Sequence, residues 1–281
     1  MRVLRILLIF LMVVIVPLLS TAYAEQKILR LATTTSTDNS GLLKALLPSF
    51  EQAFGYKVQV IAVGTGKALR MGQDGDVDLV LVHAPSAEEK FMASDYGVHR
   101  RYVMYNDFFI VGPKNDPAGI HNTKDATAAL AKIAKTSSIF VSRGDDSGTN
   151  KKEKELWKEV GINPQGNWYR AAGQAMGKVL LMADELQGYT LIDRGTWLAM
   201  QKMVDLKILV QGDNRLFNPY HIMAVNPARY PDVNYTGAMA LISWITSVDG
   251  QRLIALFRVG GQELFVPTAI PAKVAIEGRS P

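Results

Sequence analysis

The chain has 281 residues, 48% of them hydrophobic, with no cysteine and a formal net charge of +5. This length and apolar content are enough for one large core or two smaller ones, and they exclude a disordered chain and a disulfide scaffold. A charge this small, without basic runs, gives no support for a nucleic acid or an anionic membrane as partner.

The N-terminal segment is typical of a secretory signal. Arg2 and Arg5 precede an apolar run, Ile6–Leu19, which is too short for a comfortable membrane span, and the small residues of Ala22-Tyr23-Ala24 follow it. We therefore expect a signal peptide at 1–24, cleavage near Ala24 and a mature chain with a charge of +3. Because a lipid anchor needs a cysteine at the new N-terminus, the sequence predicts a soluble periplasmic protein.

The first strand leads into a segment that is unusually rich in hydroxyl groups. Lys27–Ala32 is predicted as a strand, and six of the eight residues at 33–40 are Ser or Thr. A helix should begin at Leu42 and end at Gly55, because apolar residues recur between them at spacings of three and four. One helix cap needs only one hydroxyl, so we consider an anion site here, with a Thr-rich strand end plus a cap as the alternative.

A second glycine-and-hydroxyl turn follows the next predicted strand, at Val63–Leu69. It is not a Walker A loop, because Ala68 follows the Gly-Lys pair and Ile61 occupies the position of the first glycine. Leu79–Val82 is a continuous apolar run that suits a strand covered on both faces. The alternation of strands and helices predicts an α/β protein with a doubly wound sheet, whose ligands bind at the strand ends.

Two extended segments divide the chain. Arg101–Pro113 is predicted as a long strand, and Pro219–Asn226 as a second. We expect them to connect a discontinuous lobe 1, made of 25–110 and 221–281, with an inserted lobe 2, made of 111–220. Ligand would then bind in the cleft between the lobes, and closure of the cleft would be a hinge motion. The tail from Tyr235 to Phe257 is predicted as helix.

Inside the inserted part, a strand ending at Val141 runs into Ser142–Asn150, and a helix follows over Lys151–Val160. Hydroxyls, glycines and Arg143 at a helix start favour an anion site, because the N-terminal N–H groups lack partners there. The alternative is an ordinary capped turn. Arg194 is a second candidate for an anion contact, with a surface ion pair to Asp193 as its alternative.

The residue types favour binding over catalysis. The four histidines form no close pair and cysteine is absent, so neither a metal-cation site nor a cofactor is expected. A Ser/His/Asp hydrolase lacks its Gly-x-Ser-x-Gly elbow. A small dianion needs neutral donors and one arginine, so Asp145 and Asp146 should point outward or brace Arg143. If one of them faced the ligand, it would instead accept a proton from an anion such as hydrogen phosphate.

Several motifs resemble those of the periplasmic tungstate-binding proteins of ABC importers. The resemblance rests on Thr33–Thr37, Gly75–Val80, Ser142–Thr149, Gly173–Gly177 and Tyr189–Gly195, and it covers essentially the whole mature chain. It implies a two-lobed type II periplasmic binding protein fold with two crossover segments. It also implies capture of tungstate, without enzymatic activity, for an inner-membrane permease and its ATPase.

Carried onto this chain, the family's oxyanion pocket implies a set of binding residues: Thr34, Thr35, Ser36, Thr65, Arg143, Ser147, Gly148 and Thr149, with Thr190 as a weaker candidate. Molybdate and phosphate are alternative ligands of the same class, since molybdate shares the size and charge of tungstate. An enzyme on the same architecture and a periplasmic sensor domain are alternatives of other classes. A monomer suits a shuttle to a permease.

Overall fold

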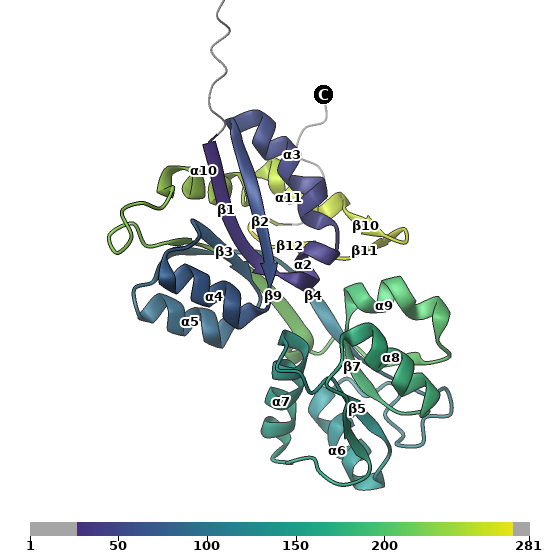
Figure 1. The fold of residues 1–281 in the computed structure, drawn as a ribbon. Coiled ribbons are helices and arrows are strands. Elements are labelled where there is room, and N and C mark those ends of the chain that lie inside the picture. Colours follow the sequence, from purple (N-terminus) through teal and green to yellow (C-terminus); the bar gives the residue numbers. More distant parts are fainter. Residues whose placement is uncertain (1–26, 272–281) are drawn as a thin grey trace, which may run out of the picture.

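The computed structural model describes residues 27–271 and arranges them as two α/β lobes, joined by two long strands that run from one lobe into the other (Figure 1). The expected signal peptide, 1–24, lies outside the described residues. No helix within 27–271 has both the length and the apolar character that a membrane crossing requires.

Lobe 1, the upper lobe in Figure 1, is built from both ends of the described chain. Its N-terminal elements are β1 (Lys27–Thr34), α2 (Thr35–Asn39), α3 (Leu42–Phe54), β2 (Tyr56–Val63), α4 (Thr65–Asp74), β3 (Leu79–Val82) and α5 (Pro85–Ala93). Its C-terminal elements are α10 (Tyr235–Ile245), α11 (Val248–Leu256), β10 (Arg258–Val259), β11 (Gln262–Glu263) and β12 (Val266–Pro267).

Lobe 2 lies between the two long strands in the sequence. The strands are β4 (Gly97–Gly112) and β9 (Phe217–Val225). Between them lie α6 (Ala126–Thr136), β5 (Phe140–Ser142), α7 (Gly148–Val160), β6 (Tyr169–Ala171), α8 (Met176–Glu185), β7 (Thr190–Asp193), α9 (Arg194–Met200), β8 (Lys207–Val210) and two 3₁₀ turns, Gln201–Met203 and Asn214–Leu216.

The central sheet has the order β12-β4-β9-β3-β1-β2. β1 pairs in parallel with β2 and β3, whereas β3 pairs antiparallel with β9, and β9 with β4. All four residues of β3 are buried, as expected for a strand covered on both faces. The ends of β1, β2 and β3 therefore meet at the edge that faces lobe 2.

Strand β4 changes partners along its length. Residues up to Asp107 pair with β9, and residues from Phe108 onward pair with β7 and β8 of lobe 2. On this pairing we propose that the lobe boundary in β4 lies between Asp107 and Phe108, near the expected position 110. The second boundary expected from the sequence, at 220, falls inside β9 (Phe217–Val225). Both strands thus run alongside each other through the junction between the lobes.

The apolar core fills one side of that junction. One buried cluster includes Leu46 and Phe50 of α3 and continues through Phe109 to Val179 and Trp197 of lobe 2. Leu264 and Phe265 belong to the same cluster. Two smaller clusters pack on the α4 and α5 face of lobe 1 and on the α6 and α7 face of lobe 2. The lobes are therefore packed together on the side of α8 and α9.

Two segments differ from the sequence expectation. The hydroxyl-rich turn contains a one-turn helix, α2, whose five residues are too few to give a periodic signal. The predicted helix at Tyr235–Phe257 is two helices, because Ser247 starts a new one by accepting a hydrogen bond from the Gly250 N–H. Both differences come from local capping by Ser or Thr.

Candidate functional site

A small pocket lies between the lobes, where β1, β2 and β3 end and α7 begins. Its cavity volume is about 80 Å³, small beside the roughly 300–1,000 Å³ of pockets for drug-sized ligands. The pocket accordingly fits a small ion. All eight residues carried over from the resemblance line it: Thr34, Thr35, Ser36, Thr65, Arg143, Ser147, Gly148 and Thr149.

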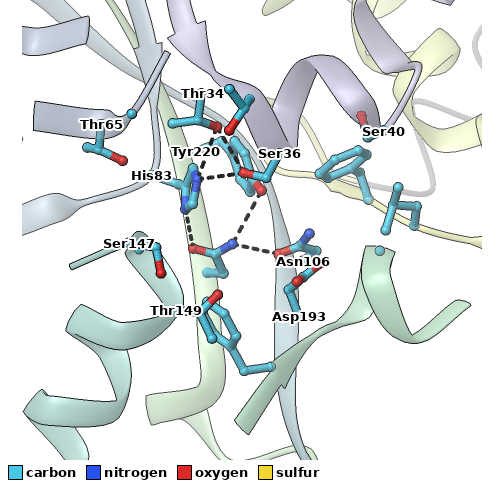
Figure 2. Close-up of a pocket in the computed structure, with 18 of the residues that line it drawn as sticks. Thr34, Ser36, Ser40, Thr65, His83, Asn106, Ser147, Thr149, Asp193 and Tyr220 are labelled. Atoms are coloured by element: carbon cyan, nitrogen blue, oxygen red, sulfur yellow. Dashed lines mark hydrogen bonds between the residues drawn. The ribbon is translucent and has the colours of Figure 1, made fainter. Parts of the chain in front are cut away.

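The lobe 1 wall begins at the end of β1. Thr33 points away from the pocket and donates its hydroxyl to the Leu81 carbonyl at 2.7 Å. Because side chains alternate along a strand, Thr34 points the other way, into the pocket (Figure 2). Its Oγ1 accepts the N–H of Thr37 at 3.2 Å and thereby caps α2, which places Thr35 and Ser36 beside it. Thr34 Oγ1 also lies 2.6 Å from Thr37 Oγ1 and 3.3 Å from His83 Nε2, so a ligand would compete with these partners for its hydroxyl proton.

Thr65 adds a second hydroxyl group from lobe 1. It is the first residue of α4 and follows Gly64, which takes an extended conformation at the end of β2. Its side chain is 8% exposed, and Figure 2 shows it on the same side of the pocket as Thr34. Ser40 also lines the pocket, but its hydroxyl donates to the Thr37 carbonyl at 2.6 Å. Thr65 is therefore better suited than Ser40 to donate to a ligand.

The lobe 2 wall is the turn between β5 and α7. Ser147 caps the helix by accepting the Asn150 N–H at 3.3 Å, and Gly148 and Thr149 form its first turn. Gly144 and Asp146 have positive φ angles of 65° and 58°, so the chain reverses tightly before the helix. The thirteen-residue helix α7 consequently directs its unpaired N-terminal N–H groups and partial positive charge at the pocket.

A buried carboxylate supports this turn from below. Glu153 of α7 accepts hydrogen bonds from Ser142 at 2.6 Å, Tyr169 at 2.7 Å and Trp157 at 3.1 Å. Glu153 is only 1% exposed, and this burial raises the pKa of its carboxyl. Glu153 thus ties the ends of β5 and β6 to α7 and fixes the base of the turn.

Arg143 is the one arginine or lysine among residues 27–271 that lines the pocket, and Asp145 and Asp146 do not line it. Arg143 Nε donates to Asp145 Oδ2 at 2.9 Å, and Asp145 Oδ1 accepts the Ser147 N–H at 3.2 Å. Asp146 points to solvent, with 75% of its side chain exposed and Lys151 Nζ at 2.8 Å from its Oδ2. Asp145 therefore braces Arg143 and Asp146 points outward, so neither aspartate faces the ligand.

His83, Asn218, Asn106 and Tyr220 line the pocket as well, and sequence reasoning did not select them. His83 Nδ1 lies 2.9 Å from Asn218 Oδ1, and its Nε2 lies 3.3 Å from Thr34 Oγ1 (Figure 2). Asn218 Nδ2 donates to Asn106 Oδ1 at 2.8 Å, so we assign the His83 proton to Nδ1. Asn218 and Thr34 lie 135 and 49 positions from His83 in the sequence, so no local sequence pattern predicts these contacts.

His83 also reaches lobe 2. A Cβ atom at Gly148 would lie 2.9 Å from His83 Cε1, so glycine is what allows α7 to approach the imidazole. The ring stacks on Tyr220 with centroids 4.6 Å apart. Burial lowers the pKa of His83 below its usual value of 6.5, and the Asn218 hydrogen bond opposes that shift. A neutral imidazole therefore connects the two walls of the pocket.

Two candidates from Tyr189–Gly195 are engaged elsewhere. Thr190 donates its hydroxyl to the Val141 carbonyl at 2.7 Å and does not line the pocket. Arg194 does not line the pocket and donates Nε to Asp107 Oδ1 at 2.5 Å, so its ion pair is with Asp107 and not with Asp193, the alternative that the sequence suggested. Asp193 instead caps α9 and lines the pocket, with its two oxygens accepting the N–H and the hydroxyl of Thr196. Among residues 27–271, no cluster of acidic and histidine side chains could hold a metal ion.

Residues 21–249 match the model of the PBP superfamily domain. The tungstate-binding protein TupA of Peptoclostridium acidaminophilum is 50% identical to the chain over 243 residues, which are 85% of each protein. The chain belongs to this TupA family, within the PBP superfamily. The TupA family consists of solute-binding proteins, not enzymes.

Two similar solved structures have the same fold. The tungstate-binding protein TupA of Desulfovibrio alaskensis is 46% identical, with a TM-score of 0.82 over 87% of this chain and 100% of that one. A structure described as the tungstate ABC transporter of Geobacter sulfurreducens is 55% identical, with a TM-score of 0.73 over 82% and 98% of the two chains. The expected two-lobed periplasmic binding protein fold is thereby confirmed.

Proposed function

We propose that the chain is the binding protein of an ABC tungstate importer and captures tungstate in the pocket between its lobes. The observation that carries this proposal is the meeting of Arg143, the start of α7 and the hydroxyls of lobe 1 around one small cavity. Membership of the TupA family supports it, since the named relatives bind tungstate.

The donors of the pocket suit a tetrahedral metal oxyanion. Such a dianion presents only acceptor oxygens, so each needs a hydrogen-bond donor. The proposed ligand contacts in lobe 1 are the side chains of Thr34, Thr35, Ser36 and Thr65. In lobe 2, Arg143 supplies the positive charge, and Ser147, Gly148 and Thr149 supply hydroxyl and backbone N–H donors.

Asp145 and Asp146 do not line the pocket, which favours a fully deprotonated anion over hydrogen phosphate as the ligand. A protonated anion needs an acceptor in the site, but Asp145 is bonded to Arg143 and Asp146 points to solvent. Asp193 is the one carboxylate among the described residues that lines the pocket, and each of its oxygens accepts one bond from Thr196 and keeps a further lone pair. A fully deprotonated oxyanion needs no such acceptor. Molybdate has the same charge and nearly the same size as tungstate, so we expect it to compete.

Export and delivery complete the proposal. We infer that the chain is cleaved near Ala24, acts in the periplasm as a soluble monomer, and hands its anion to an inner-membrane permease driven by an ATPase. The basis is the signal-like segment at 1–24 and the membership of a transporter-associated family.

Calorimetric titration of the mature chain, beginning at Glu25, tests the proposal. Sodium tungstate should bind with a stoichiometry of one, molybdate should compete, and sulfate and phosphate should bind far more weakly. Tungstate at about a hundred times its Kd should stabilise the fold by roughly 2.7 kcal/mol. Absence of both heat and thermal shift with tungstate and with molybdate would contradict the proposal.

A further inference from the structure

A second cavity adjoins the anion pocket on the side of α5 and α7. It has a volume of about 380 Å³ and shares four lining residues with the pocket: His83, Phe108, Gly148 and Asn218. Helix α5 belongs to lobe 1 and α7 to lobe 2, and the two helices lie on the same side of the molecule (Figure 1). We call this cavity the entrance groove. It adjoins the site at these four residues, and both lobes form its walls.

Lysines dominate the charge of the entrance groove. Among the described residues, one lysine from α5 and four from α7 line it: Lys90, Lys151, Lys152, Lys154 and Lys158. Glu155 is the one acidic residue of that lining. Lys151 pairs with Asp146 at 2.8 Å and Lys152 with Glu155 at 3.1 Å. In the described part of the chain, no carboxylate lies within 4.0 Å of the other three. The groove therefore carries several uncompensated positive charges.

The distribution of these lysines on α7 differs from that of an ordinary solvated face. Positions 151, 154, 155 and 158 share one helical face, and three of them are lysine. The opposite face of α7 is buried and contains Glu153, Leu156 and Trp157. A solvated helix face usually mixes both signs of charge. On α7, positive charges outnumber negative charges on the face that lines the groove.

The opposite side of the junction is packed with apolar side chains. There the core cluster with Trp197, Leu264 and Phe265 fills the junction with apolar side chains. A hydrated dianion cannot cross such a surface without losing its water, which is strongly unfavourable. The lysine-lined groove ends at His83 and Gly148, on the wall of the anion pocket.

We propose that the entrance groove is an encounter site for oxyanions: its lysines attract a free dianion and guide it to the pocket between the lobes. A cleft lined by one sign of charge concentrates counter-ions and raises association rates by about 10-fold to 1,000-fold at low ionic strength. The ammonium groups are flexible and well hydrated, so they hold the anion loosely and release it to the fixed donors around Arg143. This inference rests on the proposed oxyanion-binding function.

The test compares two triple variants of the mature chain that lose the same charge. One is Lys90→Gln/Lys154→Gln/Lys158→Gln in the groove. The control is Lys44→Gln/Lys124→Gln/Lys135→Gln, which removes three exposed lysines that line neither cavity. Rate constants for sodium tungstate are measured by stopped-flow tryptophan fluorescence at about 0.01 M and about 1 M salt, where the Debye length falls from roughly 30 Å to 3 Å.

The groove variant should associate about tenfold more slowly than the native chain at low salt, and within twofold of it at high salt. Its dissociation rate should change less than twofold, and the control should match the native chain. Equal slowing in both variants, or none in the groove variant, would overturn the inference. Failure of the native chain to bind tungstate at all would instead refute the proposed function, so the two failures are distinguishable.

Discussion

The two walls of the pocket differ in charge and in how they are held. The lobe 1 wall presents neutral hydroxyls, Thr34 and Thr65 among them, whereas the lobe 2 wall carries Arg143 and the start of α7. Lobe 2 positions its donors mainly by contacts close in the sequence, such as Arg143 with Asp145 and Ser142 with Glu153. Lobe 1 relies on distant contacts, such as Thr34 with His83. The difference assigns most of the attraction for the anion to lobe 2 and the enclosure of its far side to lobe 1.

Removing the positive charge of Arg143 should abolish this difference between the walls and cause the largest loss of tungstate affinity. Arg143→Ala should weaken tungstate binding by more than tenfold, on the order of 100-fold, because a hydrogen bond to a charged group contributes about 1.5–3 kcal/mol. Calorimetry measures the affinity. Arg170→Ala removes an exposed arginine that does not line the pocket, and it should leave binding unchanged. Equal affinity of the Arg143→Ala variant and the native chain would remove Arg143 from the site.

A methyl group at the contact between the walls should have the next largest effect. In Gly148→Ala the new Cβ would lie 2.9 Å from His83 Cε1, which forces the walls apart. We expect an affinity loss of about tenfold, or about 1.4 kcal/mol, by calorimetry. Gly66→Ala is the matched control, because its Cβ meets nothing within 4 Å and the residue does not line the pocket. If both variants bind equally well, the walls are not in contact in the bound state.

Loss of one hydroxyl from the neutral wall should cost less. Thr65→Val keeps the size of the side chain but removes a donor, and a neutral hydrogen bond contributes about 1 kcal/mol, or roughly fivefold in affinity. Thr190→Val is the complementary control, since its hydroxyl bonds Val141 and lies outside the pocket. That variant should lose about 1 kcal/mol of unfolding free energy with tungstate affinity unchanged. A loss above tenfold in Thr65→Val would contradict the assignment of attraction to lobe 2.

The smallest effect concerns pH and His83, which connects the walls. The unfolded imidazole takes up a proton near pH 6.5, but burial lowers the pKa of His83 in the folded chain. The unfolded state therefore binds more protons below pH 6.5, and this contribution lowers stability as the pH falls from there toward the folded pKa. Urea unfolding at pH 8 and pH 5.5 should show a larger loss in the native chain than in His83→Gln. A bound dianion favours the imidazolium and should reduce the loss.

The sequence was sufficient where the information is local. Local patterns predicted anion sites at the hydroxyl-rich turns, and the resemblance to the tungstate-binding family implied Thr34, Thr65 and Ser147 as pocket residues. The structure brings these turns to one pocket, the first two from parallel strands of one sheet and the third from the small β5–β6 sheet of lobe 2. Residues joined over long separations were missed. His83 contacts Asn218 across 135 positions, and Arg194 pairs with Asp107 across 87 in preference to its neighbour Asp193. Nor could periodicity show that Thr190 turns inward to Val141, because alternation fixes the face of a strand and not the partner of a hydroxyl.

The most direct test of the two-walled site is a crystal structure of the mature chain grown with tungstate, in which anomalous scattering locates the tungsten. One strong peak should lie in the pocket, with its oxygens within hydrogen-bond distance of Arg143 and Ser147 on one side and of Thr34 and Thr65 on the other. A tungsten peak outside the pocket, or one whose oxygens contact a single lobe, would contradict the account.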